Sequence, residues 1–173
     1  MAKITIIGAG VVGCATAWAL SGRGAEVTLV EQFEPGHLRG ASHGGTRIVR
    51  LAYPDPAWVA LAEESLDAWR ALEAESGREL LGLYGLVELC ANVELTSRDV
   101  LAARGIEHRL LDEQELARLG MTLPGGWVAL WQAAAGVVYA ERALEALLEL
   151  ARARACGWRP GAGSNRSTTS TAT

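Results

Sequence analysis

The sequence has few of the residues that define several protein classes. Its 173 residues include one phenylalanine and three cysteines, and its 16 basic residues are outnumbered by 20 acidic ones. The net charge of −4 excludes a strong basic field for nucleic acid or an anionic membrane surface. Cys14, Cys90 and Cys156 fit neither a disulfide framework nor a metal-ligand spacing. We therefore expect no metal and a reducing compartment.

Long apolar runs are also missing. Ile4 to Leu20 is mostly apolar, but glycines interrupt it at positions 8, 10 and 13. A spanning helix needs about 20 apolar residues, and a signal peptide needs no such glycine pattern. We therefore expect a cytoplasmic protein with no membrane partner.

The composition that remains is typical of a globular α/β protein. Half of the residues are hydrophobic and 21% are charged, which excludes wholesale disorder, collagen and a heptad rod. Twenty glycines with one phenylalanine favour a glycine-punctuated α/β fold over a β-sandwich. The length corresponds to about one domain.

The first 31 residues predict a strand–helix–strand unit. Lys3–Ile7 is rich in β-branched residues and predicts a buried strand, Val11–Leu20 predicts a helix, and Glu26–Val30 predicts a second strand that ends at the acid Glu31. A βαβ unit needs about 30 residues.

Residues 8–13 read Gly-Ala-Gly-Val-Val-Gly, a complete G-x-G-x-x-G motif between the predicted strand and helix. Gly8 permits a tight turn, Gly10 lets the backbone approach a pyrophosphate, and Gly13 allows close packing of helix on strand. The helix N-terminus offers N–H groups to the phosphates. We predict a dinucleotide site, with a mere glycine-rich turn as the alternative.

Glu31 stands where such sites carry an acid. Its carboxylate can accept hydrogen bonds from a ribose and would repel a 2′-phosphate, which favours FAD or NAD over NADP. The alternative is an exposed glutamate at a strand end.

The rest of the chain predicts further helices and strands. The pair Asp55 and Pro56 predicts a helix start. One face of this helix carries Trp58, Leu61, Ser65, Trp69 and Leu72, and we expect both tryptophans in the core. Other predicted elements are a loop over 32–46, strands over 85–89 and 108–111, helices over 93–104 and 141–155, a capping box at Asp112 and Glu115, and strands over 127–131 and 137–139 that could pair with each other.

The composition changes abruptly at Gly157. Residues 157–173 hold seven serines or threonines and three glycines, with no aliphatic residue larger than alanine, so we expect disorder. Two explanations remain open: an out-of-frame tail and a natural variable linker.

Two runs that follow Glu31 carry a resemblance to a known family. Residues 31–37 read Glu-Gln-Phe-Glu-Pro-Gly-His, and residues 40–53 read Gly-Ala-Ser-His-Gly-Gly-Thr-Arg-Ile-Val-Arg-Leu-Ala-Tyr. They resemble the D-amino-acid-oxidase superfamily of FAD-dependent oxidoreductases, and within it the sarcosine oxidase and N-methyltryptophan oxidase group. Ala41 and Ser42 stand where the group usually has Ser and then Ser or His. The resemblance extends to about residue 155.

The resemblance implies site residues. FAD would be held by the glycine turn and by the segment from Ser42 to Arg47. Arg47 would lie beside the flavin ring, where positive charge stabilises the reduced form, His43 would border the flavin, and Arg50 would bind the substrate carboxylate. For Arg47 and Arg50 the alternative is a solvated helix face. The implied cofactor contacts are Gly8, Gly10, Val11, Val12, Gly13, Glu31, Gln32, Ser42, His43, Thr46 and Arg47.

The resemblance also implies an organisation. We expect the N-terminal part of a Rossmann-like FAD-binding domain with segments of a mixed α+β substrate domain. Residues 1–31 would be the FAD-binding βαβ unit, 32–53 the flavin loop, 54–156 helical and substrate-domain segments, and 157–173 the disordered tail. The family's remaining functional residues match nothing in this chain. We therefore expect an incomplete, inactive fragment in which helix residues including Leu144, Leu147 and Leu148 lack cover.

The function implied by the resemblance is oxidation of the C–N bond of a secondary or N-methyl amino acid. The substrate would be a small amino acid with a carboxylate, and molecular oxygen would accept the electrons. Two alternatives stay open: a non-catalytic truncated remnant and an NAD-dependent dehydrogenase. The run from His43 to Tyr53 counts against the dehydrogenase, because a nicotinamide site needs no such loop.

Overall fold

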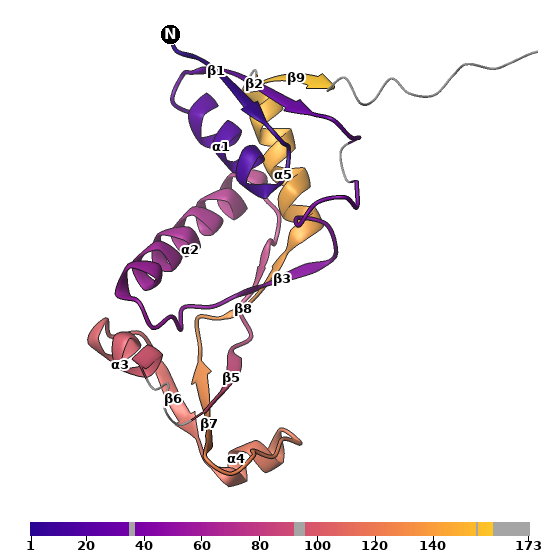
Figure 1. Cartoon of the computed structure of the whole chain (residues 1–173). Helices are drawn as coiled ribbons and strands as arrows, with labels where there is room; N and C mark the ends of the chain where they lie inside the picture. Colours follow the sequence, from indigo (N-terminus) through magenta and orange to yellow (C-terminus); the bar gives the residue numbers. More distant parts are fainter. Residues whose placement is uncertain (35–36, 92–95, 155, 161–173) are drawn as a thin grey trace, which may run out of the picture. The chain divides into compact units, whose positions relative to one another are not determined.

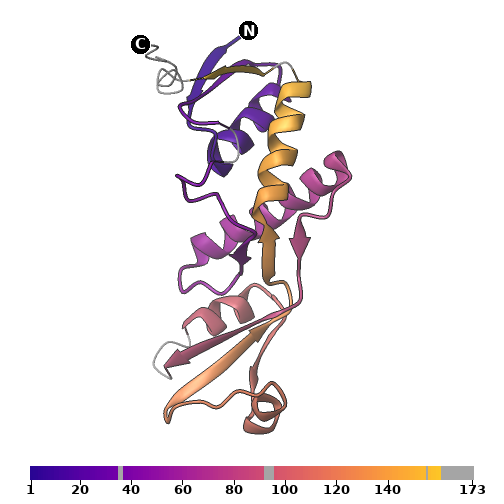
Figure 2. The same cartoon turned by 90° about the vertical axis from the view of Figure 1, so that its right-hand side faces the viewer.

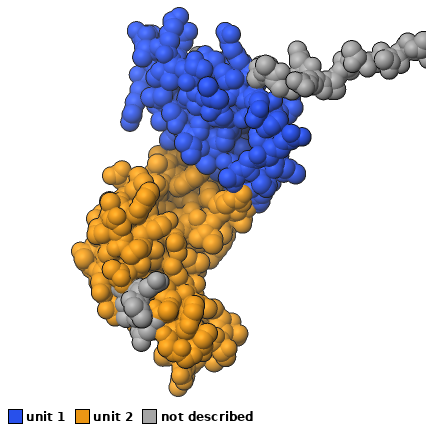
Figure 3. Space-filling model, in the orientation of Figure 1, with its two compact units in different colours: residues 1–45, 140–173 blue, residues 46–139 orange. Residues whose placement is uncertain are grey.

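The computed structural model describes residues 1–34, 37–91, 96–154 and 156–160 (Figure 1). The chain forms two compact units, coloured separately in Figure 3. Unit 1 comprises residues 1–45 and 140–173, and unit 2 comprises residues 46–139. Each unit has its own sheets and is described by itself.

Unit 1 opens with the predicted strand–helix–strand arrangement. β1 (Lys3–Ile7) and β2 (Glu26–Glu31) pair in parallel, and α1 (Val11–Ser21) connects them. This confirms the predicted α/β fold. The expectation that β1 is buried is wrong: none of its residues is buried, and Ile7 is 87% exposed. Among the described residues β1 pairs only with β2, at one edge of the sheet.

A second helix covers the sheet of unit 1. α5 (Ala140–Ala153) packs against α1, and both lie on the same face of the sheet (Figures 1 and 2). Leu147 and Leu148 are 1% and 7% exposed, so the expectation that they lack cover is wrong. The facing helix α1 contributes Cys14 and Ala17, both fully buried, and such small side chains let two helices approach closely.

The chain does not become irregular at Gly157 as expected. β9 (Gly157–Pro160) pairs in parallel with β2, from Thr28 opposite Gly157 to Glu31 opposite Pro160, and completes the order β1-β2-β9. The edge of β2 supplies backbone partners, so pairing requires few apolar side chains. The rest of the predicted disordered tail, residues 161–173, lies outside the described residues.

The described residues of unit 2 form two antiparallel sheets. The first has the order β3-β8-β4, from β3 (Thr46–Val49), β8 (Gly136–Tyr139) and β4 (Leu81–Gly82). The second has the order β5-β7-β6, from β5 (Leu86–Ala91), β7 (Trp127–Gln132) and β6 (His108–Leu111). The predicted pairing of the strands at 127–131 and 137–139 is therefore wrong, because β7 and β8 belong to different sheets. The loop predicted over 32–46 ends one residue earlier, because Thr46 is the first residue of β3.

The part of unit 2 that the structure describes also has three helices: α2 (Pro56–Ser76), α3 (Thr96–Ala103) and α4 (Glu113–Arg118). Asp112 and Glu115 form the predicted capping box of α4. Residues 93–95 of the helix predicted over 93–104 lie outside the described residues.

The capping prediction for α2 is also confirmed, because the side chain of Asp55 accepts the N–H of Ala57 at 2.8 Å. Near its C-terminus, Glu73 Oε1 accepts the N–H groups of Leu80 and Leu81 at 2.8 and 2.9 Å, which ties the helix to β4. Val59 and Leu72 are buried, whereas Trp58 is 57% exposed, so its expected place in the core is wrong.

Candidate functional site

The glycine turn between β1 and α1 has the geometry that its sequence predicts. Gly8 has a φ of +97°, in the region that favours glycine, and its N–H donates to the carbonyl of Val30 at 2.8 Å. A Cβ added at Gly13 would lie 1.9 Å from the Gly8 carbonyl oxygen. Only glycine at position 13 lets α1 start this close to the turn. The N-terminus of α1 therefore follows the carboxyl end of β1 directly.

Glu31, at the end of β2, lies beside this turn. The residue is 7% exposed. Its Oε2 accepts the N–H of Ala9 at 2.8 Å, and its Oε1 accepts the N–H of Phe33 at 3.0 Å. His37 Nε2 lies 3.6 Å from Oε1. Burial alone would raise the pKa of Glu31, but three backbone N–H donors and His37 lower that pKa below its usual value of 4.5. Glu31 is thus an ionised carboxylate joined to the glycine turn.

The segment after Glu31 folds back over the turn. Ser42 Oγ accepts the N–H of Val11, the first residue of α1, at 3.0 Å. A Cβ added at Gly10 would lie 3.1 Å from the same oxygen. His43 Nδ1 contacts the carbonyl oxygen of Gly40. The turn and this segment enclose a cavity of about 140 Å³, which is lined by Ala9, Gly10, Glu31, His37, Gly40, Ala41, Ser42, His43 and Leu144.

The structure thus brings four of the predicted cofactor contacts, Gly10, Glu31, Ser42 and His43, around one cavity in unit 1. Gly8, Val11, Val12, Gly13 and Gln32 belong to the adjoining turn, helix and strand end, and Val12 is 77% exposed. The remaining predicted residues, Thr46, Arg47 and Arg50, belong to unit 2.

Arg47 lies on β3 and Arg50 directly follows that strand, so the alternative of a helix face is excluded for both. Arg47 Nη1 donates to the carbonyl of Thr46 at 2.7 Å. Arg50 Nη1 lies 2.6 Å from Glu88 Oε1, and its guanidinium lies 5.0 Å from the centre of the Tyr53 ring. Burial lowers the pKa of Arg50, but Tyr53 and Glu88 outweigh burial and raise the pKa above its usual value.

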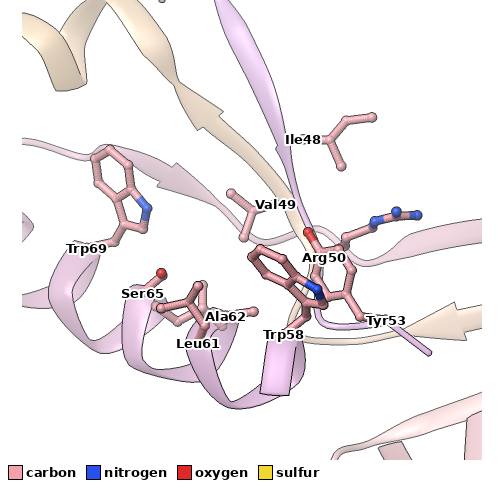
Figure 4. Close-up of a pocket in the computed structure, with 10 residues that line it drawn as sticks. Ile48, Val49, Arg50, Tyr53, Trp58, Leu61, Ala62, Ser65 and Trp69 are labelled. Atoms are coloured by element: carbon pink, nitrogen blue, oxygen red, sulfur yellow. The ribbon is translucent and has the colours of Figure 1, made fainter. Parts of the chain in front are cut away.

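A groove of about 240 Å³ lies between β3 and α2, next to Arg50 (Figure 4). Val49 and Tyr53 line one side of it, and one face of α2 lines the other with Trp58, Leu61, Ala62, Ser65 and Trp69. Ile48, Trp58 and Leu61 are 70%, 57% and 51% exposed. Trp58 and Trp69, which were expected in the core, therefore line a surface groove in unit 2.

Sequence reasoning missed Glu88 and Gln132, the two side chains that hold the segment around Arg50. Glu88 forms the ion pair described above, and Gln132 Oε1 accepts the N–H groups of Leu51 and Ala52. One signal was available for Glu88, since it is the only charged residue in the otherwise apolar strand Leu86–Ala91.

In the described ranges, no group of three or more His, Cys, Asp or Glu side chains could hold a metal ion. No helix in the same ranges is long and apolar enough to span a bilayer.

The chain matches known proteins over nearly all of its length. The family model of FAD dependent oxidoreductases matches residues 3–162. The chain is 38% identical over 152 residues to human peroxisomal sarcosine oxidase, covering 85% of this chain and 39% of that protein. It is 39% identical over 154 residues to monomeric sarcosine oxidase of Streptomyces avermitilis, covering 86% of this chain and 40% of that protein.

Solved structures also match the chain over most of its length. NikD, described as an unusual amino acid oxidase essential for nikkomycin biosynthesis, superposes with a TM-score of 0.78 at 26% identity, over 92% of this chain and 44% of that chain. L-proline dehydrogenase from P. horikoshii superposes with a TM-score of 0.77 at 22% identity, over 92% of this chain and 44% of that chain, which shows a shared fold. The chain spans 39% and 40% of the length of the two sarcosine oxidases. With the glycine turn, Glu31 and this match, the chain belongs to the family of FAD-dependent oxidoreductases.

Proposed function

We propose that unit 1 binds the adenosine and pyrophosphate part of FAD, in a protein that oxidises the C–N bond of secondary or N-methyl amino acids. The observation that carries this proposal is the glycine turn at the N-terminus of α1 with the Glu31 carboxylate held beside it. The substrate class rests on the relatives, whose names are sarcosine oxidase and amino acid oxidase.

The residues of the turn fit the pyrophosphate. Gly10 has no side chain at the cavity, so phosphate oxygens can approach the backbone there. The N-terminus of α1 contributes backbone N–H groups and partial positive charge. Ser42 Oγ accepts the N–H of Val11, and its own O–H can donate to a phosphate oxygen.

Glu31 fits the ribose. An ionised carboxylate has about four acceptor positions, and the N–H groups of Ala9, Phe33 and Gln32 occupy three of them. The remaining position can accept a ribose hydroxyl. The negative charge would repel a 2′-phosphate, which favours FAD and disfavours NADP.

The predicted site residues of unit 2 would act on the substrate and on the flavin ring. Bound FAD supplies a two-electron acceptor for oxidation of the C–N bond. Arg50 would bind the substrate carboxylate through its planar fork of N–H donors. Arg47 would supply positive charge, and His43, which belongs to unit 1, would border the ring system. Molecular oxygen is the proposed electron acceptor, and peroxide formed in step with substrate loss would distinguish it from other acceptors.

We also propose the cytoplasm as the location. The cysteine usage of the sequence supports it. The human relative is named as peroxisomal, so fractionation of cells that express the chain would decide between the two compartments.

Titration of the chain with FAD, followed by quenching of flavin fluorescence, tests the cofactor site. We expect saturable binding that ADP competes for. Gly10→Val should weaken binding by more than about tenfold, because the added side chain would stand where phosphate oxygens approach the backbone. A loss of about 1.4 kcal/mol in binding free energy is already a tenfold loss of affinity. Gly125→Val is the control, because a Cβ there has no atom within 4 Å and Gly125 lies in unit 2, outside the proposed FAD contacts, so this variant should bind like the wild type. Equal affinity of the wild type and Gly10→Val would refute the placement.

A further inference from the structure

Glu88 is an acid on an apolar strand, held against the arginine proposed to bind substrate. It lies on β5, and its Oε1 is 2.6 Å from Arg50 Nη1. The two side chains are 26% and 38% exposed. Glu88 Oε2 is buried and has no hydrogen-bond partner among the described residues. One oxygen of the carboxylate therefore contacts the guanidinium, and the other is buried in unit 2.

Gln132 holds the next two residues of the same segment. It is fully buried on β7, and its Oε1 accepts the N–H of Leu51 at 2.9 Å and that of Ala52 at 3.0 Å. In the β5–β7 ladder, Leu86 pairs with Gln132 and Glu88 pairs with Leu130. Because side chains alternate along a strand, Glu88 and Gln132 lie on the same face of the sheet, diagonal to each other.

Three consecutive residues, 50–52, are thus held from one face of one sheet, residue 50 by its side chain and residues 51 and 52 by their backbone. We propose that Glu88 is a positioning residue for Arg50: with Gln132 fixing the backbone, it fixes the guanidinium so that the rest of its donor fork is oriented for a carboxylate. This rests on the proposed function, in which Arg50 binds the substrate carboxylate.

The geometry favours positioning over simple blockage. Glu88 contacts the guanidinium through one nitrogen, Nη1, whereas a guanidinium has five N–H donors. The Tyr53 ring supports the guanidinium, 5.0 Å from its centre. An arginine side chain loses rotamer entropy when it is ordered, and this ordering is already achieved before a ligand arrives. The anchor itself is rigid, because β5 is paired along its whole length with β7.

The test uses the full chain and the NMR signal of the Arg50 side-chain Nε–H group, assigned by its loss in Arg50→Ala. Acetate is the carboxylate probe, and acetamide is its neutral counterpart. The variants are Glu88→Ala, which removes the contact, and Glu88→Gln, which keeps an acceptor of the same shape. The control is Glu63→Ala, which breaks a comparable ion pair with Arg104 at 2.5 Å elsewhere in unit 2. Thermal unfolding monitors the fold of each variant.

In the wild type we expect an ordered Arg50 signal that acetate shifts and acetamide does not. In Glu88→Ala the signal should lose its order and acetate affinity should fall about tenfold, which corresponds to most of the ordering entropy of an arginine side chain. Glu88→Gln should stay within about threefold of the wild type, since it keeps the hydrogen bond. Glu63→Ala should behave like the wild type.

Three other results have definite meanings. An ordered Arg50 with unchanged or tighter acetate binding in Glu88→Ala would overturn the proposal, because Glu88 would then be a bystander or a competitor. If Glu88→Ala does not fold, loss of Arg50 order in the folded Glu88→Gln would overturn the hydrogen-bond mechanism, and retained order would support it. Loss of order in Glu88→Ala without an acetate-induced shift in any variant would support positioning by Glu88 and refute the carboxylate role of Arg50.

Discussion

Single atoms decide whether the turn before α1 can form. The Cβ of any residue other than glycine at position 13 would meet the Gly8 carbonyl oxygen at 1.9 Å. That oxygen belongs to the backbone, so no rotation of a side chain relieves the overlap. Glu31 then joins the turn from the other side, through the N–H of Ala9. The turn therefore depends on the absence of a Cβ at Gly13 and on the hydrogen bond that the Glu31 carboxylate accepts from Ala9.

The charge on Glu31 makes stability depend on pH. Its pKa in the folded state lies below the usual value of 4.5. The ionised carboxylate therefore stabilises the fold above about pH 4.5, and this contribution is lost as the pH falls through the folded-state pKa. In Glu31→Gln we expect a smaller loss of stability on acidification than in the wild type. The midpoint of urea unfolding, measured at a series of pH values, checks this.

Glu64→Gln is the matched control for this measurement, because Glu64 is an exposed glutamate on α2. It should keep the pH dependence of the wild type. If Glu31→Gln and the wild type lost stability in parallel below pH 4.5, the backbone N–H donors would not lower the pKa of Glu31 in the folded protein.

Helix α2 shows how an element is delimited by its own ends. Asp55 accepts the N–H of Ala57, and Pro56 occupies the first turn, where its missing N–H costs nothing. At the other end, Gly77 has a φ of +67° and donates its N–H to the carbonyl of Glu73. These signals are local, so the boundaries of the helix follow from the sequence.

Removing the cap of α2 should destabilise the protein measurably. For Asp55→Ala we expect a loss of about 0.5–2 kcal/mol, the usual cost of an N-cap carboxylate. Urea unfolding followed by circular dichroism gives the value. Asp67→Ala, an exposed aspartate within the same helix, should cause no loss, because no cap depends on it. Equal destabilisation by both variants would show that charge, and not capping, is responsible.

At the scale of the whole molecule, the three cysteines are distributed over both units and differ in burial. Cys14 is fully buried in unit 1, where burial above all raises the pKa of its thiol to about 12. Burial also raises the pKa of Cys156. Cys90, on β5 in unit 2, is half-buried. Since the thiolate is the reactive form, the three thiols should differ strongly in reactivity.

Alkylation at pH 8, followed by mass spectrometry of peptides, tests this pattern. Cys90 should react first, and Cys14 at least about a hundredfold more slowly, as its thiolate fraction and its access are both small. In concentrated urea all three should react at similar rates. Rapid labelling of Cys14 in the native protein would contradict the packing of α1 against α5.

Much of unit 1 follows from the sequence because its signals are short in range. The spacing of Gly8, Gly10 and Gly13 predicts the turn, and the acid at the end of the next predicted strand marks Glu31. Both lie within a span of 31 residues in which strand, helix and strand are consecutive neighbours. Backbone sterics and apolar patterning act over such distances, so the sequence by itself determines this strand–turn–helix–strand segment of unit 1 and the family to which the chain belongs.

Other features depend on contacts between distant parts of the chain, which no local pattern encodes. β7 and β8 are separated by three residues yet pair in different sheets, β7 with β5 and β6, and β8 with β3 and β4. β9 is a strand because the edge of β2 accepts it, although its composition suggested disorder. Glu88 meets Arg50 across 38 residues, and Gln132 meets Leu51 across 81. Only the tertiary structure decided these pairings, because backbone edges and buried polar groups are satisfied by whichever partner the whole fold brings near.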